Sequence, residues 1–325
     1  MRLEYHSDSR SQAHPAGLLA KSFAAFWAFA GSRPLATVSM VVLLSIAALA
    51  LLADVVAPYD PLAQNVDLRL RPPGSEHYFG TDGFGRDVFS RVIHGARMSL
   101  FVGVLSVSIS AVVGISVGTF SAYWGGKLDL LVQRGVDVLL GFPFLVLAFI
   151  MVVAMGPSPI SLAIAIALAL APQVARLSRA SALSVKEEPY VEAARASGAG
   201  IFRIIRKQVL ANSFPPVLAQ VTGYFGAAVS AETALSFLGL GVPPPYPSWG
   251  RMLQEGARYY FETAPWATLF PGMALSLTVL AAVLLGDAVR DLLDPRRALT
   301  GRPMPRNQPP PEVSPGHSGT IRRTP

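Results

Sequence analysis

The stretch Pro189-Tyr-Val-Glu-Ala-Ala-Arg-Ala-Ser-Gly198 lies inside a polar segment, residues 178–212, between two long apolar runs. Both of its ends carry signals for a short helix. Pro189 suits the first turn of a helix, because its ring fixes the backbone angle that this turn requires. Gly198 suits the left-handed conformation at which helices commonly end. We therefore predict a short helix over residues 189–197.

A second short helix is predicted directly after this glycine. Apolar residues recur there at near-helical spacing, at Ile201, Ile204, Ile205 and Val209. Pro215 and Pro216 follow, and we expect them to end this second helix. Two short helices joined at a glycine between apolar runs are typical of a docking element; a solvated amphipathic connector is the alternative.

The composition of the whole chain is that of a membrane protein. Of its 325 residues, 52% are hydrophobic and 14% are charged, whereas soluble domains carry roughly 25% charged residues. The net charge of +7 does not indicate nucleic-acid binding, because the arginines lie beside the apolar runs and suit orientation in a membrane. The chain has no cysteine, so neither disulfides nor thiolate chemistry are available.

Six apolar runs predict six membrane-spanning helices, at about residues 35–53, 99–122, 138–155, 160–174, 216–235 and 267–285. Before the second span we expect a separate amphipathic helix along the membrane surface, capped by Thr81 or Asp82. Residues 125–137 are expected to form a short polar turn, and Pro143 to kink the third span. Residues 236–266 are expected to form a partly re-entrant loop.

The distribution of charge orients these spans. Residues 176–212 carry seven basic side chains against three acidic ones, whereas residues 54–97 carry five arginines against six acidic residues. The positive-inside rule therefore predicts that residues 178–212 and both termini lie in the cytoplasm.

Glu192-Ala193-Ala194, followed after three residues by Gly198, resembles the EAA signature of ABC-importer permeases. In that family this loop sits in a groove of the cytoplasmic ATPase. The resemblance implies that Glu192, Ala193, Ala194 and Gly198 couple ATP hydrolysis to movement of the spans. The chain departs from the signature downstream, where the family usually continues Ile-Leu-Pro-Asn and this sequence has Val209-Leu-Ala-Asn212.

Further blocks resemble the dipeptide, oligopeptide and nickel branch of the same family: residues 80–100, 232–250 and 286–296. The resemblance implies an all-α membrane protein with the type I ABC importer permease fold, in a bacterial inner membrane. It implies a transport subunit without catalytic residues, metal or cofactor. The implied partners are a second homologous permease in a heterodimer, two cytoplasmic ATPase subunits, an extracytoplasmic substrate-binding protein and membrane lipids; nucleic acid is not expected.

On this interpretation the chain divides into four parts. Residues 1–33 form a cytoplasmic N-terminal segment, and residues 34–98 form the first transmembrane helix and an extracytoplasmic segment. Residues 99–296 form the core permease domain with its cytoplasmic coupling loop, residues 178–212. Residues 297–325, rich in proline, arginine and serine, form a disordered cytoplasmic tail.

Two other classes of protein fit the sequence less well. An intramembrane hydrolase could use Gly114-Ile-Ser-Val-Gly118, which matches the G-x-S-x-G elbow, but no histidine lies in an apolar run, and close helix packing explains the glycines more simply. An ion-coupled carrier would need ionisable residues in several spans, and Glu232 is the one clear case.

Glu232 is expected either to line the translocation path or to reach water near the outer interface. No Walker A run, G-x-x-x-x-G-K-[ST], occurs in the chain, so the energy is expected to come from a partner. The solute stays open among peptides, nickel complexes, opines and glutathione, because these importers share the same blocks.

Overall fold

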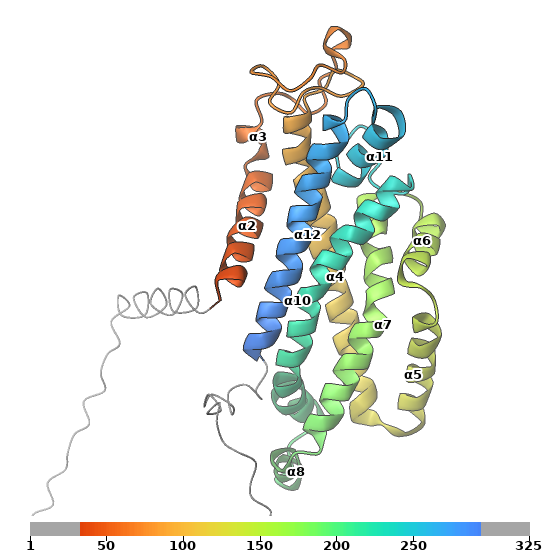
Figure 1. Cartoon of the computed structure of the whole chain (residues 1–325). Helices are drawn as coiled ribbons and strands as arrows, with labels where there is room; N and C mark the ends of the chain where they lie inside the picture. Colours follow the sequence, from red (N-terminus) through yellow and green to blue (C-terminus); the bar gives the residue numbers. More distant parts are fainter. Residues whose placement is uncertain (1–32, 294–325) are drawn as a thin grey trace, which may run out of the picture. The chain divides into compact units, whose positions relative to one another are not determined.

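The computed structural model describes residues 33–293, which form helices joined by loops, with no strand among them (Figure 1). The predicted N-terminal segment, apart from Arg33, and the predicted tail lie outside these residues. Four of the described helices are long and apolar enough to cross a membrane: α2 (Pro34–Leu51), α4 (Val88–Trp124), α7 (Pro159–Lys186) and α12 (Trp266–Leu293). A fifth span results if the bent pair α5 (Gly126–Leu140) and α6 (Phe144–Met155) is counted as one.

The remaining predicted span corresponds to α10 (Ala211–Phe237), which is long enough but less apolar than the others. Its 27 residues extend about 40 Å at 1.5 Å per residue. The helix packs against α4, α7 and α12, and it carries polar residues, including Gln220 and the buried Glu232. By apolarity alone the described residues therefore give four or five spans rather than six.

The surface helix predicted before the second span is wrong, because α4 runs without a break from Val88 to Trp124. Its 37 residues extend about 55 Å, well beyond the roughly 30 Å of a hydrocarbon core. The predicted caps are also wrong. Asp87 is the N-cap, and its carboxylate accepts a hydrogen bond from the Ser90 amide at 2.8 Å.

The polar turn predicted at residues 125–137 is also wrong, because it is most of helix α5. Asp129, Gln133 and Asp137 follow one another at intervals of four, so they share one face of an amphipathic helix rather than marking a turn. Between α5 and α6 the chain bends by 93°. Pro143, the N-cap of α6, lies at this break.

The predicted pair of short helices is present, but the second does not end at the prolines. After α8 (Pro189–Ala196), α9 (Ile201–Ile204) continues through a π-helical turn, η2 (Ile205–Leu210), directly into α10. Pro215 and Pro216 lie inside α10. Proline is tolerated in spanning helices because local π-helical adjustments and neighbouring side chains satisfy the freed backbone groups.

The close helix packing predicted from Gly114 and Gly118 is confirmed, and the helix that packs against α4 there is α7. A Cβ atom added at Gly118 would lie 2.3 Å from the carbonyl oxygen of Ala175, and one at Gly114 would lie 2.8 Å from that of Ala171. Only glycine allows the two backbones to approach this closely.

The chain places its connections at two opposite ends of the bundle (Figure 1). One end carries the loop after α3 (Ala53–Val56), the short η1 (Val66–Leu68) and α11 (Trp249–Tyr259), which lies within the segment predicted to be re-entrant. The other end carries α8. We call these the α11 end and the α8 end.

Candidate coupling and translocation elements

Helix α8 begins at Pro189, as predicted, and ends at Ala196, one residue before the predicted end. Pro189 occupies its first turn, and Gly198 follows it with φ +78°. A Cβ atom added at Gly198 would meet no atom within 4 Å, so the backbone angle rather than crowding favours glycine at this position.

One apolar side chain and one aromatic ring hold α8 against the bundle. Val191 is fully buried in a cluster with Ala122 of α4, Ala182 of α7 and Ile204 of α9. The ring of Tyr123 lies 5.6 Å from both Lys186 Nζ and the guanidinium carbon of Arg195.

Lys186, the last residue of α7, joins the end of α7 to the end of α4. Its ammonium donates hydrogen bonds to the carbonyl oxygens of Tyr123, at 2.8 Å, and Ala122, at 3.1 Å. Because these carbonyls lie at the last turn of α4, a cation is favourable there. The ends of α4 and α7, against which Val191 of α8 packs, are thus joined to each other.

The four residues of the EAA signature lie on the accessible part of this element. Glu192, Ala193 and Gly198 are exposed, and Ala194 is half-buried. Within residues 33–293 Glu192 forms no ion pair. The structure therefore places Glu192, Ala193 and Ala194 on α8 and Gly198 two residues after its end, and it leaves three of the four open to a contact outside the chain.

Sequence reasoning missed the apolar part of the same surface. Tyr190, Ile201 and Phe202 have exposed fractions of 43%, 53% and 75%. Exposed aromatic side chains beside a polar rim are typical of protein–protein contact sites. Of the four apolar residues that predict the second helix, Ile204, Ile205 and Val209 are buried, whereas Ile201 is exposed.

Glu232 is fully buried where α4, α10 and α11 meet. Its carboxylate accepts hydrogen bonds from Ser236 at 2.8 Å, Ser99 at 3.1 Å and Thr233 at 3.4 Å. No basic side chain among residues 33–293 forms a salt bridge with it. Three hydroxyl groups from two helices therefore satisfy a carboxylate that has no contact with solvent in this conformation.

The Pro247-Ser248-Trp249-Gly250 block closes the bundle beside Glu232. Ser248 caps α11 by accepting a hydrogen bond from the Arg251 amide at 3.3 Å. Trp249, 1% exposed, donates from its indole nitrogen to the carbonyl oxygen of Val92 at 2.9 Å. Gly250 lies so close to α10 that a Cβ atom would be 2.6 Å from the Cβ of Ser236.

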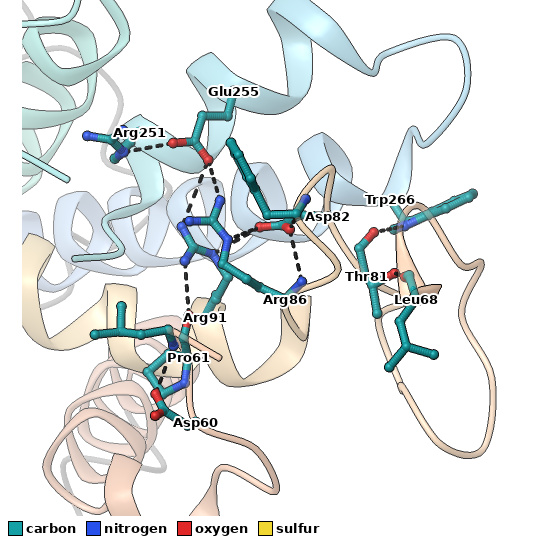
Figure 2. Close-up of polar contacts among 12 residues, drawn as sticks. Asp60, Pro61, Leu68, Thr81, Asp82, Arg86, Arg91, Arg251, Glu255 and Trp266 are labelled. Carbon is teal, nitrogen blue, oxygen red and sulfur yellow. Dashed lines mark hydrogen bonds and ion pairs between the residues drawn. The ribbon is translucent and has the colours of Figure 1, made fainter. Parts of the chain in front are cut away.

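A buried ion-pair network lies at the same end and was not predicted (Figure 2). It comprises Asp82, Arg86, Arg91, Arg251 and Glu255, which we call the five-residue network. Arg86 donates to Asp82 at 2.6 Å and to Glu255 at 2.8 Å. Arg251 also donates to Glu255, at 2.8 Å, and Arg91 Nε lies 3.4 Å from Asp82.

The five-residue network joins three separate parts of the chain. Asp82 and Arg86 belong to the loop before α4, Arg91 to α4, and Glu255 to α11. Arg91, 1% exposed, also donates to the carbonyl oxygen of Pro61 at 3.0 Å. The loop is further held by Thr81, whose carbonyl oxygen accepts from the Trp266 indole at 3.0 Å (Figure 2).

Comparison with known proteins identifies the class of protein. Residues 110–299 match the family described as binding-protein-dependent transport system inner membrane component. Residues 25–73 match the N-terminal TM domain of oligopeptide transport permease C.

Relatives resemble the chain over most of its length. The di/tripeptide transport system permease protein DppC of Pseudomonas aeruginosa is 42% identical, over 83% of this chain and 91% of its own. The dipeptide transport system permease protein DppC of Alkalihalophilus pseudofirmus is 40% identical, over 81% of this chain and 86% of its own. The MetNI methionine ABC transporter in inward-facing conformations has a similar fold, with a TM-score of 0.52 and 19% identity over 62% of this chain and 96% of the solved chain.

The chain therefore belongs to the family of binding-protein-dependent transport system inner membrane components. It is a permease subunit of an ABC importer in a bacterial inner membrane, a transport component rather than an enzyme. Such a subunit works with ATPase partners and with a binding protein. The description of the family names the binding protein.

Proposed function

We propose that this chain conducts peptides across the membrane together with a second homologous permease, and that α8 receives the motion of two cytoplasmic ATPase subunits. Similarity to dipeptide and di/tripeptide permeases supports the solute class. The observation that carries the coupling role is that α8 is exposed along its signature residues and yet fixed to the bundle through Val191.

This arrangement suits the transmission of movement from the ATPase subunits to the spanning helices. On one side α8 contacts the ends of α4 and α7 through Val191 and Tyr123. On the other side Gly198 leads into α9, which continues without a break into α10. The small side chains of Ala193 and Ala194 allow a groove wall to approach the helix closely. Because the surrounding residues are rich in lysine and arginine, the α8 end is assigned to the cytoplasm.

The test compares two glycines that differ in backbone angle. Gly198 has φ +78°, whereas Gly200 has φ −64°, and neither has an atom within 4 Å of an added Cβ. Gly198→Val adds roughly 1–2 kcal/mol of local strain, which is enough to tilt α8 but not to unfold the bundle. In reconstituted complexes we expect Gly198→Val to uncouple ATP hydrolysis from uptake, and Gly200→Val to have little effect.

Glu192→Lys reverses the charge on the exposed face of α8 and is expected to act like Gly198→Val. Deleting residues 309–325, which lie outside the described part of the chain, is the control and should leave coupling intact. Full coupling in both point variants, together with a loss on truncation, would refute the assignment of the coupling role to α8.

We further propose that Glu232 contributes to the translocation path when α10 moves relative to α4. Its burial under three hydroxyl groups supports a closed conformation in which it faces no solute. Glu232→Gln keeps the size of the side chain but removes its charge. We expect impaired uptake with normal assembly of the complex; unchanged uptake would assign Glu232 a purely structural role.

A further inference from the structure

An apolar groove runs between α2 and α4, in the half of the bundle nearer the α11 end. Leucine and alanine side chains of α2 line one side of it, and leucine, phenylalanine and valine side chains of α4 line the other. Phe225 of α10 also lines the groove, which has a volume of about 620 Å³. On α2 the lining residues lie within residues 43–51, and on α4 within residues 97–108. We call this hollow the α2–α4 groove.

The two spans that form the groove determine its depth in the membrane. Helix α2 has 18 residues and extends about 27 Å, so it needs its whole length to cross a hydrocarbon core of roughly 30 Å. Residues 43–51 are the second half of this helix, and residues 100–108 lie at the beginning of the second predicted span. The apolar part of the groove therefore faces the acyl chains of one leaflet, and it runs in the direction of those chains.

Arg97 lies at the mouth of the groove, where α2 ends. Its Nε donates to the carbonyl oxygen of Ala50 at 3.0 Å, and its Nη2 donates to that of Leu51 at 3.2 Å and to Asp54 at 3.0 Å. Within residues 33–293 no hydrogen bond or ion pair involves the third nitrogen, Nη1, and the side chain is 45% exposed. The guanidinium is thus held in place and keeps one donor for a contact outside the chain.

A second, polar hollow of about 400 Å³ shares Arg97 with the α2–α4 groove. Asp54, Asp60 and Tyr246 also line it. Asp60 is exposed, and it forms no ion pair with any residue from 33 to 293. Tyrosine is enriched at the membrane–water interface, and Asp54 follows directly after the α2 span. The polar hollow therefore lies at the level of the lipid headgroups and adjoins the apolar groove.

We propose that the α2–α4 groove and the polar hollow together bind one phospholipid with an ammonium headgroup. An acyl chain lies in the groove, Nη1 of Arg97 donates to the phosphate, and the carboxylate of Asp60 accepts from the ammonium group. Hydrogen bonds between charged groups are about twice as strong as those between neutral ones. With the α8 end in the cytoplasm, this lipid belongs to the extracytoplasmic leaflet.

The packing of α2 gives the lipid a structural role. On α2 only Ala36, Ser39 and Ala50 are buried, so a chain in the groove adds van der Waals contacts between α2 and α4. An apolar helix of the second permease would supply such contacts as well. It would offer neither a phosphate to Arg97 nor a cation to Asp60, whereas the lipid offers both.

The first experiment fills the groove. Ala47→Phe adds a ring to the groove lining, whereas Ala48→Phe adds the same ring at an exposed position outside the lining. Binding of dioleoylphosphatidylethanolamine to the complete, detergent-purified transporter is titrated by native mass spectrometry. We expect Ala47→Phe to weaken binding at least about fivefold, because packing contacts are lost, and Ala48→Phe to leave it unchanged. Equal binding by the two variants would overturn the proposal. So would loss of the assembled complex in Ala47→Phe alone, since a permease helix would then cover the groove.

The second experiment tests the ammonium contact. Asp60→Asn removes the carboxylate, and Asp67→Asn is the matched control, because Asp67 is exposed at the same end and does not line the hollow. Dioleoylphosphatidylglycerol has the same acyl chains and a phosphate but no ammonium group. We expect the parent and Asp67→Asn to bind the phosphatidylethanolamine at least about threefold more tightly, and Asp60→Asn to lose this preference. A parent without the preference, or Asp60→Asn with it, would overturn the choice of headgroup.

The third experiment tests the phosphate contact. Both lipids carry a phosphate, so Arg97→Gln is expected to weaken the binding of each at least about fivefold. Unchanged binding would exclude Arg97 from the site. These measurements need neither a transported solute nor ATP, so a failure of the lipid site leaves the proposed peptide transport untouched, and a failure of peptide transport leaves the lipid site untouched.

Discussion

The two ends of the helix bundle use their charged residues in opposite ways. At the α11 end, Arg91, Arg86 and Asp82 are 1%, 5% and 9% exposed and are paired with one another or with Glu255. At the α8 end, Glu192 is exposed and forms no ion pair within residues 33–293. We interpret the α11 end as closed by contacts within the chain, and the α8 end as presenting its charges to a partner.

How strongly substitutions at the two ends should differ in their effect on stability depends on the free energy of burying a charge. A buried ion pair is weak evidence for high stability, because desolvating its members costs about as much as their attraction returns. Removing one member alone is different, since it leaves an uncompensated charge in a medium of low dielectric constant. The two ends should therefore respond very differently to single substitutions.

The largest effect is expected for Asp82→Asn. Asp82 contacts two buried arginines and accepts hydrogen bonds from the amides of Phe84, at 2.8 Å, and Arg86, at 3.0 Å. Breaking one partner of a buried pair costs about 3–5 kcal/mol. We expect a marked fall in the melting temperature of the detergent-solubilised protein.

The matched control is Glu76→Gln in the same loop. Glu76 is 76% exposed and lies 3.9 Å from Arg71. Exposed pairs of this kind contribute about 0–1 kcal/mol. Equal melting temperatures for the Asp82 and Glu76 variants would show that the five-residue network does not hold the α11 end together.

A smaller effect is expected for Trp249→Phe. The substitution keeps an aromatic ring in the buried site but removes the indole donor, so the carbonyl oxygen of Val92 loses its side-chain partner. The carbonyl keeps its partner within helix α4, so the loss is that of one net hydrogen bond, about 0.5–1.5 kcal/mol. Trp124→Phe is the control, because Trp124 is 52% exposed. The same melting temperature for both variants would count against the anchoring role of Trp249.

Local signals predicted helix α8 well and the α11 end poorly. Pro189 and Gly198 determine the ends of α8 by their own backbone preferences, so neighbouring residues in the sequence are sufficient to predict it. Arg91 gave no such signal. Its partners Asp82 and Glu255 come together only after folding, and an arginine near an apolar run is therefore interpreted as lying at the membrane surface.

The same limit explains the continuity of α4 and α10. Because the charge of Arg91 is balanced by the carboxylate of Asp82, the helix around it can remain part of the bundle. No separate surface helix is needed. Pro215 and Pro216 were predicted to end a helix by their local effect, but α10 continues through them after the π-helical turn η2. The exposure of Phe202 likewise depends on which side of α9 meets the bundle, which periodicity alone did not show.

At the α8 end a moderate effect on association is expected for Phe202→Ser. The side chain is 75% exposed, so its loss should leave the melting temperature of the permease unchanged. If Phe202 contacts the ATPase, truncation costs about 1 kcal/mol or more, which weakens association roughly fivefold. The measurement is the affinity of the solubilised permease for its ATPase. Tyr78→Ser, at the α11 end and 60% exposed, is the control, and equal affinities would exclude Phe202 from the contact.

The smallest effect is expected for an exposed pair at the α11 end, which tests whether burial rather than position makes the five-residue network important. Asp54 is 71% exposed and lies 3.0 Å from Arg97. Hydrogen bonds from Arg97 and then His94 hold the pKa of Asp54 below its ordinary value of 3.8. A carboxylate whose pKa is lowered by folding stabilises the folded state at pH values above the pKa of the unfolded state, and this contribution disappears as the pH falls through the folded pKa.

Because the Asp54 side chain is exposed, water and salt screen the interaction, and Asp54→Asn should leave the melting temperature unchanged near neutral pH. A fall as large as that of Asp82→Asn would show that charges at the α11 end matter irrespective of burial, and the contrast between the two ends would then need another explanation.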